Sequence, residues 1–279
     1  MKLLRVIHDH ALSPAENMAC DEVLGRSMLI RGGAAFARFY RWSPPTLSFG
    51  FFQPIERLID PAVAAAAGIG LVRRSSGGKM VFHADEITFS IGMPLRLLRG
   101  DAPGTDFLSC FRAVMQPLVD ALVTAGVPAR FSADHEVESG RSDRIHCYAA
   151  AAGHSVYAGA KKLVGAAGIV KGEILTVHGS LPITRTPLPG TLFLGTARSA
   201  ALPDIAVLSD FIGADGIGTL PDRVAGQLAE RFDLMAAGSE YEPVESREID
   251  ILSREKYTRL DWKSLPPATW EVPLSSAER

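Results

Sequence analysis

The sequence is poor in cysteine. Its 279 residues contain only Cys20, Cys110 and Cys147, an odd number that is too small for a disulfide framework. None of the three belongs to a Cys-x-x-Cys pair, which argues against a structural zinc site, and we expect neither a metal nor a cofactor. A reducing compartment would leave three free thiols, so the question is whether any of them is a nucleophile.

Long apolar runs and an excess of positive charge are also missing. No run approaches the ~18 apolar residues that a membrane span requires. The first nine residues carry charges where a signal peptide has its apolar core. A formal net charge of −2 gives no basic footprint, which argues against nucleic acid as a partner. These absences predict a soluble protein of the cytoplasm that has no nucleic-acid or membrane partner.

The order of expected elements favours an α+β fold. An apolar fraction of 47% over this length suits one large domain with a modest appendage. Hairpins are frequent and strand–helix–strand repeats are few, which predicts mixed or antiparallel sheets flanked by helices. We expect a catalytic domain over residues 1–240. Residues 241–279 have too few apolar side chains for a core of their own, so we expect a C-terminal extension packed on that domain.

Periodicity and capping signals predict the individual elements. Ser13, Pro14 and Glu16 form a helix start with a capping box. A proline–aspartate pair at 221–222 predicts another helix start, a short strand is expected near Leu192, and 133–144 is expected as a loop. The expected strands are 3–7, 36–42 (half-buried), 46–49, 69–72, 80–83, 87–93, 155–159 and 173–181, and the expected helices are 14–29, 60–67, 105–125, 208–212 and 220–235.

A polar loop from Arg73 to Lys79 joins two apolar runs through Gly77 and Gly78. Glycines leave backbone N–H groups uncovered, and Arg73 and Arg74 add positive charge beside them. The loop could therefore bind an anionic or carbonyl-bearing ligand. It could equally be an ordinary β-hairpin with surface arginines.

Cys147 and Lys162 are the candidates for acyl-transfer chemistry. A thiol becomes a nucleophile when a nearby cation stabilises its thiolate, and a lysine on the following strand could do this and also polarise a carbonyl. Cys20 and Cys110 lie within predicted helices and are expected to be packing residues. The residues alone leave open whether Cys147 is catalytic or also part of the core.

Five ordered blocks resemble one enzyme superfamily. The stretch from Arg73 to His83 is similar to the Arg-Arg-x-x-Gly-Gly…His signature of the biotin/lipoate protein ligases and transferases. The other blocks are 18–22, 41–53, the Lys-x-x-Gly-x-Ala segment 162–167 and the His-Gly-Ser segment 178–180. The resemblance runs from about residue 3 to about residue 235 and implies the ligase-like catalytic fold.

Within this superfamily the chain resembles the cysteine-dependent octanoyltransferases. The stretch from His83 to Ser90 is similar to their Asp-Glu-Leu-Thr-Tyr-Ser version, and Cys147 stands fifteen residues before Lys162, as their Cys-Phe pair does. The chain also lacks room for the extra C-terminal domain of many long ligases. Departures are Ser76 in place of threonine, an alanine-rich stretch after Cys147, and Gly168 in place of glutamine.

The resemblance implies a two-step transfer with assigned residues. Cys147 would take an octanoyl group from acyl-carrier protein as a thioester and pass it to a lysine of a lipoyl domain, either the glycine cleavage H protein or a 2-oxoacid dehydrogenase E2. Lys162 would be its dyad partner, and His83 and His178 could instead be structural histidines. The implied acyl and donor site has one wall of Arg74, Gly77, Gly78 and His83, a second wall of Gly165, Ala166 and Ala167, and His178 near the attacking amine.

Other readings of the same site remain open at this point. An amidotransferase between lipoyl domains would use the same dyad, and an ATP-dependent lipoate ligase would leave Cys147 incidental. A non-catalytic binding module would need neither Cys147 nor Lys162. The sequence fixes neither the donor, the chain length, the preferred acceptor domain nor the oligomeric state.

Overall fold

A large mixed sheet runs through the centre of the protein. The computed structural model describes residues 2–31, 34–99, 106–133, 147–149, 155–194 and 204–264. The first three strands in space pair in parallel, and the other neighbours pair antiparallel. In spatial order the strands are β11 (Leu234–Gly238), β1 (Lys2–Leu12), β2 (Ala35–Trp42), β6 (Glu86–Pro94), β10 (Ile174–Pro182), β9 (Lys161–Lys171), β8 (Val156–Ala158) and β7 (Ala129–Phe131).

A smaller sheet of three strands lies beside the large one. Its central strand β3 (Thr46–Phe49) pairs in parallel with β4 (Gly70–Arg73) and antiparallel with β5 (Val81–His83). The strands β4 and β5, which flank the Gly-Gly loop, are therefore not partners, and the predicted hairpin is wrong. The loop instead crosses the end of β3, which places it against the large sheet.

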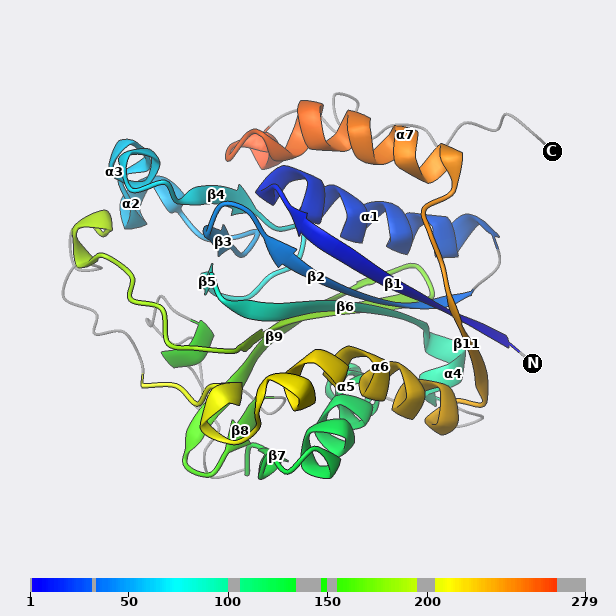
Figure 1. The fold of residues 1–279 in the computed structure, drawn as a ribbon. Helices are drawn as coiled ribbons and strands as arrows, with labels where there is room; N and C mark the ends of the chain where they lie inside the picture. The colour runs from blue at the N-terminus through cyan, green and yellow to red at the C-terminus, as the bar shows by residue number, and fades with distance from the viewer. Residues whose placement is uncertain are drawn as a thin grey trace.

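Helices cover both faces of the large sheet (Figure 1). On one side lie α1 (Pro14–Arg31) and α7 (Pro243–Leu252), and on the other lie α4 (Leu95–Arg99), α5 (Phe107–Thr124) and α6 (Ala214–Arg231). Because both faces are covered, β2 and β6 are almost wholly buried, so the half-buried pattern expected for 36–42 is wrong. The remaining short helices are α2 (Ile55–Leu58), α3 (Pro61–Ala66), η2 (Cys147–Ala149), η3 (Gly190–Leu192), η5 (Leu208–Asp210), the π-helical turn η6 (Ser253–Tyr257) and η7 (Trp262–Ser264).

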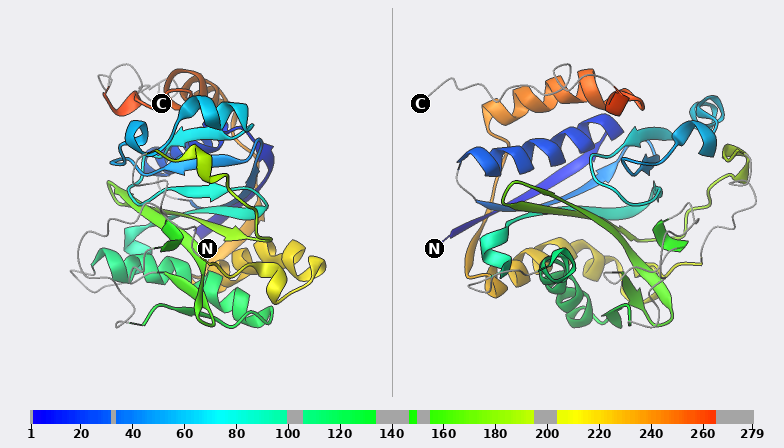
Figure 2. Two further views of the ribbon diagram at one scale, coloured as in Figure 1. Left: turned by 90° about the vertical axis from the view of Figure 1, so that its left-hand side faces the viewer. Right: turned by 180° about the vertical axis from the view of Figure 1, so that it is seen from behind.

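The α+β prediction and most elements are confirmed. The capping box of α1 is present, since the Ser13 backbone N–H donates to Glu16 Oε2 at 2.9 Å and the Glu16 N–H donates to Ser13 Oγ at 3.3 Å. Helix α5 has the length and mean hydropathy (18 residues, 1.3) of a membrane span. Its apolar side, however, supplies Phe111, Val114 and Leu118 to the main core beneath the sheet. Figure 2 shows the helices on both faces of the large sheet from the end and from behind.

Three local predictions are wrong. The helix expected to start at Pro221 begins at Ala214, and Pro221 lies in its interior. That helix ends at Arg231 and not at 235, because the residues from Leu234 form β11, which pairs with β1. The local sequence contains no signal for this pairing. Near Leu192 the chain forms η3 in place of a strand. The predicted loop 133–144 lies almost entirely outside the described residues.

The segment after residue 240 packs on the first helix. Trp262 and Tyr257 join Met18 and Val23 of α1 in one buried apolar cluster. The buried Lys256 Nζ donates to Glu22 Oε2 of α1 at 2.7 Å. The division at residue 240 stays a prediction, because the contacts describe packing and not an independently folding unit.

Candidate active site

Cys147 and Lys162, the predicted nucleophile and its partner, lie next to each other. Cys147 opens η2, and Lys162 is the second residue of β9. Lys162 is 6% exposed, and its Nζ donates a hydrogen bond to the carbonyl oxygen of Cys147 at 2.7 Å. The backbone N–H of Cys147 donates to the carbonyl of Met80 at 2.9 Å. The thiol-bearing segment is therefore held between the end of the Gly-Gly loop and the buried lysine.

Small residues leave space around the thiol. A Cβ at Gly165 would lie 3.3 Å from Cys147 Sγ, which is closer than most real Cβ contacts. On the opposite wall, Gly78 has a φ of +91°, and a Cβ there would lie 3.3 Å from the Cβ of Ala167. The two predicted walls therefore meet at Gly78 and Ala167.

The space that remains between the walls is a cavity of about 20 Å³. Cys147 is half-buried at this cavity. Of the predicted site residues, Gly77, Gly78 and Lys162 do not line it, and the ones that do are Arg74, His83, Cys147, Gly165, Ala166, Ala167 and His178.

The two arginines of the loop hold main chain. Arg73 donates to the carbonyls of Phe51, Gln53 and Leu260, at 2.8, 2.8 and 2.7 Å. The guanidinium of Arg74 donates to the carbonyl and hydroxyl of Ser48 and to the carbonyl of Lys79. The idea of surface arginines is therefore wrong, because both are buried and shape the loop.

Arg74 is also a cation beside the thiol. Burial lowers the pKa of Arg74 to about 10, while the interaction with Cys147 raises it. The guanidinium therefore stays protonated at neutral pH. It provides a second positive charge near Cys147, in addition to Lys162.

His83 is built into a hydrogen-bonded wall. Its Nδ1 lies 2.7 Å from Glu86 Oε1, its Nε2 lies 2.6 Å from Ser48 Oγ, and its ring stacks on Trp42 with centroids 4.3 Å apart. Because a carboxylate only accepts, Nδ1 is the donor in the pair with Glu86. Ser180 also donates to Glu86, at 2.5 Å. His83 therefore faces the cavity with both ring nitrogens engaged.

His178 forms a second buried network. Its Nε2 lies 2.6 Å from Ser76 Oγ, and its Nδ1 lies 3.7 Å from Asp21 Oδ2. Asp21 also accepts from Arg38 Nη1 at 2.8 Å and from the Tyr40 hydroxyl at 3.0 Å. Burial lowers the pKa of His178, although Asp21 opposes the shift, so the ring is mainly neutral at pH 7.

The other cysteines are packed inside the protein, as expected. Cys20 and Cys110 are each 2% exposed. Burial raises the pKa of Cys20 to about 11, so this side chain is a thiol at neutral pH. Within the described part of the chain, no three His, Cys, Asp or Glu side chains gather as a metal ion would require. A half-buried thiol with two nearby cations and small-residue walls suits the chemistry of a thioester.

Sequence reasoning missed part of the site. Asp21 and Glu22 received no role in the site, yet they are only 7% and 9% exposed, and Asp21 contacts His178. Glu86 received no role, although it joins His83 to Ser180. The signal for Glu86 was its place in the block from His83 to Ser90, but its partners come from strands far apart in the sequence.

Comparisons with known sequences give consistent matches. The family described as lipoyl protein ligase A/B catalytic domain matches residues 13–187. The chain is 32% identical to octanoyltransferase LipM of Moorella thermoacetica over 184 residues, which is 64% of this chain and 65% of that protein. The chain thus spans slightly less than two thirds of that relative. It is 29% identical to octanoyltransferase LipM of Kyrpidia tusciae over 94% of this chain and 98% of that one.

Solved structures share the fold. The bi-partite lipoate protein ligase of Thermoplasma acidophilum superposes with a TM-score of 0.73 at 20% identity, over 94% of this chain and 96% of that chain. A lipoate-protein ligase A bound with ATP gives a TM-score of 0.70 at 22% identity, over 94% and 97% of the two chains. These likenesses confirm the predicted fold.

Proposed function

The chain belongs to the lipoyl protein ligase A/B catalytic domain family, and we propose that it is an octanoyltransferase that works through a thioester on Cys147. The observation that carries this proposal is the Lys162 Nζ held 2.7 Å from the carbonyl oxygen of Cys147, a residue that lines the small-residue cavity. The relatives named octanoyltransferase LipM support the same activity. An ATP-dependent lipoate ligase would not need a half-buried thiol at the position of Cys147.

In the first step the Cys147 thiolate attacks the carbonyl of an octanoyl thioester. The new C–S bond forms as the bond to the donor's sulfur breaks, and the departing thiolate takes up a proton. Lys162 and Arg74 are cations near Cys147, and they would stabilise the negative charge that develops on the carbonyl oxygen. The product is an octanoyl thioester on Cys147.

In the second step the ε-amine of a target lysine attacks this thioester. An amide bond forms, the C–S bond to Cys147 breaks, and the thiolate is restored. His178 is neutral because burial lowers its pKa, so it can accept the proton that the attacking amine must lose. The contact with Asp21 would orient the ring for this role.

The acyl chain requires the two walls to part. A cavity of about 20 Å³ is much smaller than the ~300 Å³ of a typical small-ligand site. A Cβ at Gly78 would lie 3.3 Å from the Ala167 Cβ, so the walls are closest at these two residues, where an apolar chain would separate them. Gly77 and the stretch from Gly165 to Ala167 have little side-chain bulk to obstruct this opening.

The proposed partners are two carrier domains. Octanoyl–acyl-carrier protein would be the donor, and a lipoyl domain of the glycine cleavage H protein or of a 2-oxoacid dehydrogenase E2 would be the acceptor. We expect the reaction in the cytoplasm, where these partners meet. Within this proposal residues 1–240 carry the catalysis, and the segment from residue 241 supports α1.

An intact-mass experiment tests the covalent step. The protein is incubated with octanoyl–acyl-carrier protein without ATP, and we expect the mass of one octanoyl group to be added. The adduct should vanish in Cys147→Ser and persist in Cys110→Ala, which alters a core cysteine away from the cavity. Modification of a lipoyl domain that requires ATP, with no adduct on Cys147, would point to a ligase instead.

The role of Lys162 is tested by the pH profile of thiol alkylation. Lys162→Ala should slow alkylation of the Cys147 thiol at neutral pH, because one nearby cation is lost. Lys161→Ala is the matched control, since Lys161 is 46% exposed and pairs with Asp204 at 2.7 Å. An unchanged profile in Lys162→Ala would remove the argument for the dyad.

A further inference from the structure

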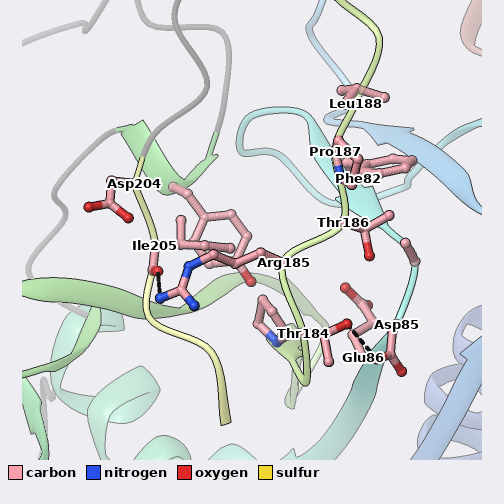
Figure 3. A pocket seen from close by; sticks show the side chains of 13 residues that line it. Phe82, Asp85, Glu86, Thr184, Arg185, Thr186, Pro187, Leu188, Asp204 and Ile205 are labelled. Carbon is pink, nitrogen blue, oxygen red and sulfur yellow. Dashed lines mark hydrogen bonds between the residues drawn. The ribbon is translucent and has the colours of Figure 1, made fainter. Parts of the chain in front are cut away.

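A second and larger cavity lies next to the thiol segment and has no role in the steps described above. It measures about 290 Å³ and is close to the size of a typical small-ligand site. Figure 3 shows it between the loop of residues 182–188, the start of β6 and the segment at Asp204 and Ile205. We call it the arm cavity and define it by Phe82, Ala84, Tyr148, Thr184, Thr186 and Ile205.

The arm cavity and the small cavity are lined by neighbouring residues of the same segments. On β5, His83 faces the small cavity, while Phe82 faces the arm cavity. In η2, Cys147 lines the small cavity and Tyr148 the arm cavity. A ligand whose reacting carbonyl lies at Cys147 therefore has both cavities within one residue of that point.

A hydrogen-bonded layer holds the two cavities apart. The Tyr148 hydroxyl donates to the Ser180 carbonyl at 2.9 Å and lies 3.0 Å from Ser180 Oγ, which in turn donates to Glu86. Burial raises the pKa of Tyr148 well above its usual value, so the phenol keeps its proton and remains a donor. The two halves of a linear substrate would thus be sorted to separate sites.

The two halves of an acyl thioester differ in what they need. The acyl chain has a free end, so a closed site can hold it. The thiol half is tethered to a carrier protein, so its site must open to solvent. The rim of the arm cavity meets this need, since the side chains of Arg185, Asp85 and Asp204 are 48%, 43% and 69% exposed.

The lining also suits a chain of mixed polarity. Phe82, Ile205 and the Tyr148 ring offer apolar contact. The Thr186 hydroxyl lines the same cavity, and the Thr184 hydroxyl, which donates to Asp85 at 2.6 Å, can still accept from an amide N–H (Figure 3). At the rim, Arg185 is held by Asp210 at 2.8 and 2.6 Å and by the Ile205 carbonyl at 3.2 Å. These contacts use three of the five N–H donors of the guanidinium, and the two that remain can donate to a phosphodiester.

We propose that the arm cavity binds the phosphopantetheine arm of the acyl donor, with its amides along the threonines and its phosphodiester near Arg185. This inference rests on the proposed function and adds to it where the leaving half of the substrate lies. The acyl chain then occupies the small cavity, and the thioester carbonyl lies between the two at Cys147.

Filling the arm cavity tests the proposal. Thr186 is exposed, so Thr186→Trp can place an indole in the cavity without disturbing the core, and Ala84→Leu fills it from another wall. Thr191→Trp is the matched control, because Thr191 is also exposed and does not line the cavity. Acyl-enzyme formation is followed in a single turnover with two donors, S-octanoyl-phosphopantetheine and S-octanoyl-2-mercaptoethanol, which lacks the arm.

We expect both filling variants to slow acylation by the phosphopantetheine donor about tenfold or more and to leave the short donor within about twofold. Thr191→Trp should change neither rate. Equal losses with both donors would overturn the proposal in favour of an acyl chain in this cavity, and unchanged rates would place the arm elsewhere. A loss confined to transfer from preformed acyl-enzyme to a lipoyl domain would assign the cavity to the acceptor and would also overturn it.

A binding measurement separates this inference from the proposed function. S-methyl-phosphopantetheine cannot react, and it should bind the unaltered protein and Thr191→Trp but not Thr186→Trp, as followed by ligand-observed NMR. If neither donor acylates the unaltered protein, the proposed function fails, and this binding pattern still decides the arm cavity. Equal binding to all three proteins, or binding to none, would overturn the inference.

Discussion

Lys256→Met should destabilise the protein by about 3 kcal/mol, because breaking a buried ion pair leaves one charge uncompensated. The Lys256 side chain is 1% exposed and pairs with Glu22, 4% exposed, at 2.7 Å. Its ammonium also lies 4.1 Å from the centre of the Trp262 ring, a contact worth about 1–2 kcal/mol when it is desolvated. The methionine keeps the apolar stem, so the loss reports mainly on the charge.

The assay is equilibrium unfolding in urea at pH 7, with a thermal melt as a check. For a chain of this size the melting temperature should fall by roughly 6–10 °C. Arg259→Met removes an exposed pair with Asp261 and should leave the stability almost unchanged, so it is the matched control. A double-mutant cycle with Glu22→Gln should give a coupling energy of about 2 kcal/mol.

Two results would refute this reasoning. A loss below about 1 kcal/mol in Lys256→Met, or strictly additive single variants, would mean that the C-terminal segment is not anchored through this pair. The pH dependence gives an independent check. Burial raises the pKa of Glu22, but Lys256 and the other partners outweigh burial, so the folded pKa is lower than usual. The stability that Glu22 contributes is therefore present above an ordinary carboxyl pKa of about 4.3. It is lost as the pH falls through the lower folded pKa.

Three further predictions concern the site. Gly78→Ala should cost about 1–2 kcal/mol of unfolding free energy because φ is +91°, whereas Gly77→Ala, with nothing within 4 Å, should be nearly neutral; equal denaturant midpoints would contradict this. Burial lowers the folded pKa of His178, so the stability that its neutral ring contributes is complete above about pH 6.5 and is lost as the pH falls. If a His178→Asn variant lost stability on acidification just as steeply, His178 would not be the cause. Gly165→Ala should slow alkylation of Cys147 about tenfold by crowding Sγ, and an unaltered rate would show that the thiol can move aside.

Local sequence signals predicted much of the fold. Capping residues and the spacing of apolar side chains act within a few residues, so α1 and the core helix α5 emerged near their true bounds. The pairing of β11 with β1 did not, because Leu234 gains its partner from the other end of the chain. For the same reason the hairpin was wrong: β4 and β5 each bond to β3, and nothing local reveals a strand between them.

The site divides in the same way. Fifteen residues separate Cys147 from Lys162, and the sequence blocks were enough to nominate both as partners. The sequence could not indicate that the guanidinium of Arg74 would donate hydrogen bonds to Ser48 and Lys79 and so shape the loop. That outcome depends on where β3 ends relative to the loop.

By itself the sequence determined which chemical groups are available and which family the chain resembles. These follow from residue types at fixed spacings along the chain. Only the tertiary structure decided what each group touches: Asp21 beside His178, Glu86 between His83 and Ser180, and a second cavity one residue away from the thiol. The physical reason is that burial and hydrogen bonding depend on distances in space, and packing the sheet between two helical layers brings together residues more than two hundred positions apart, such as Glu22 and Lys256.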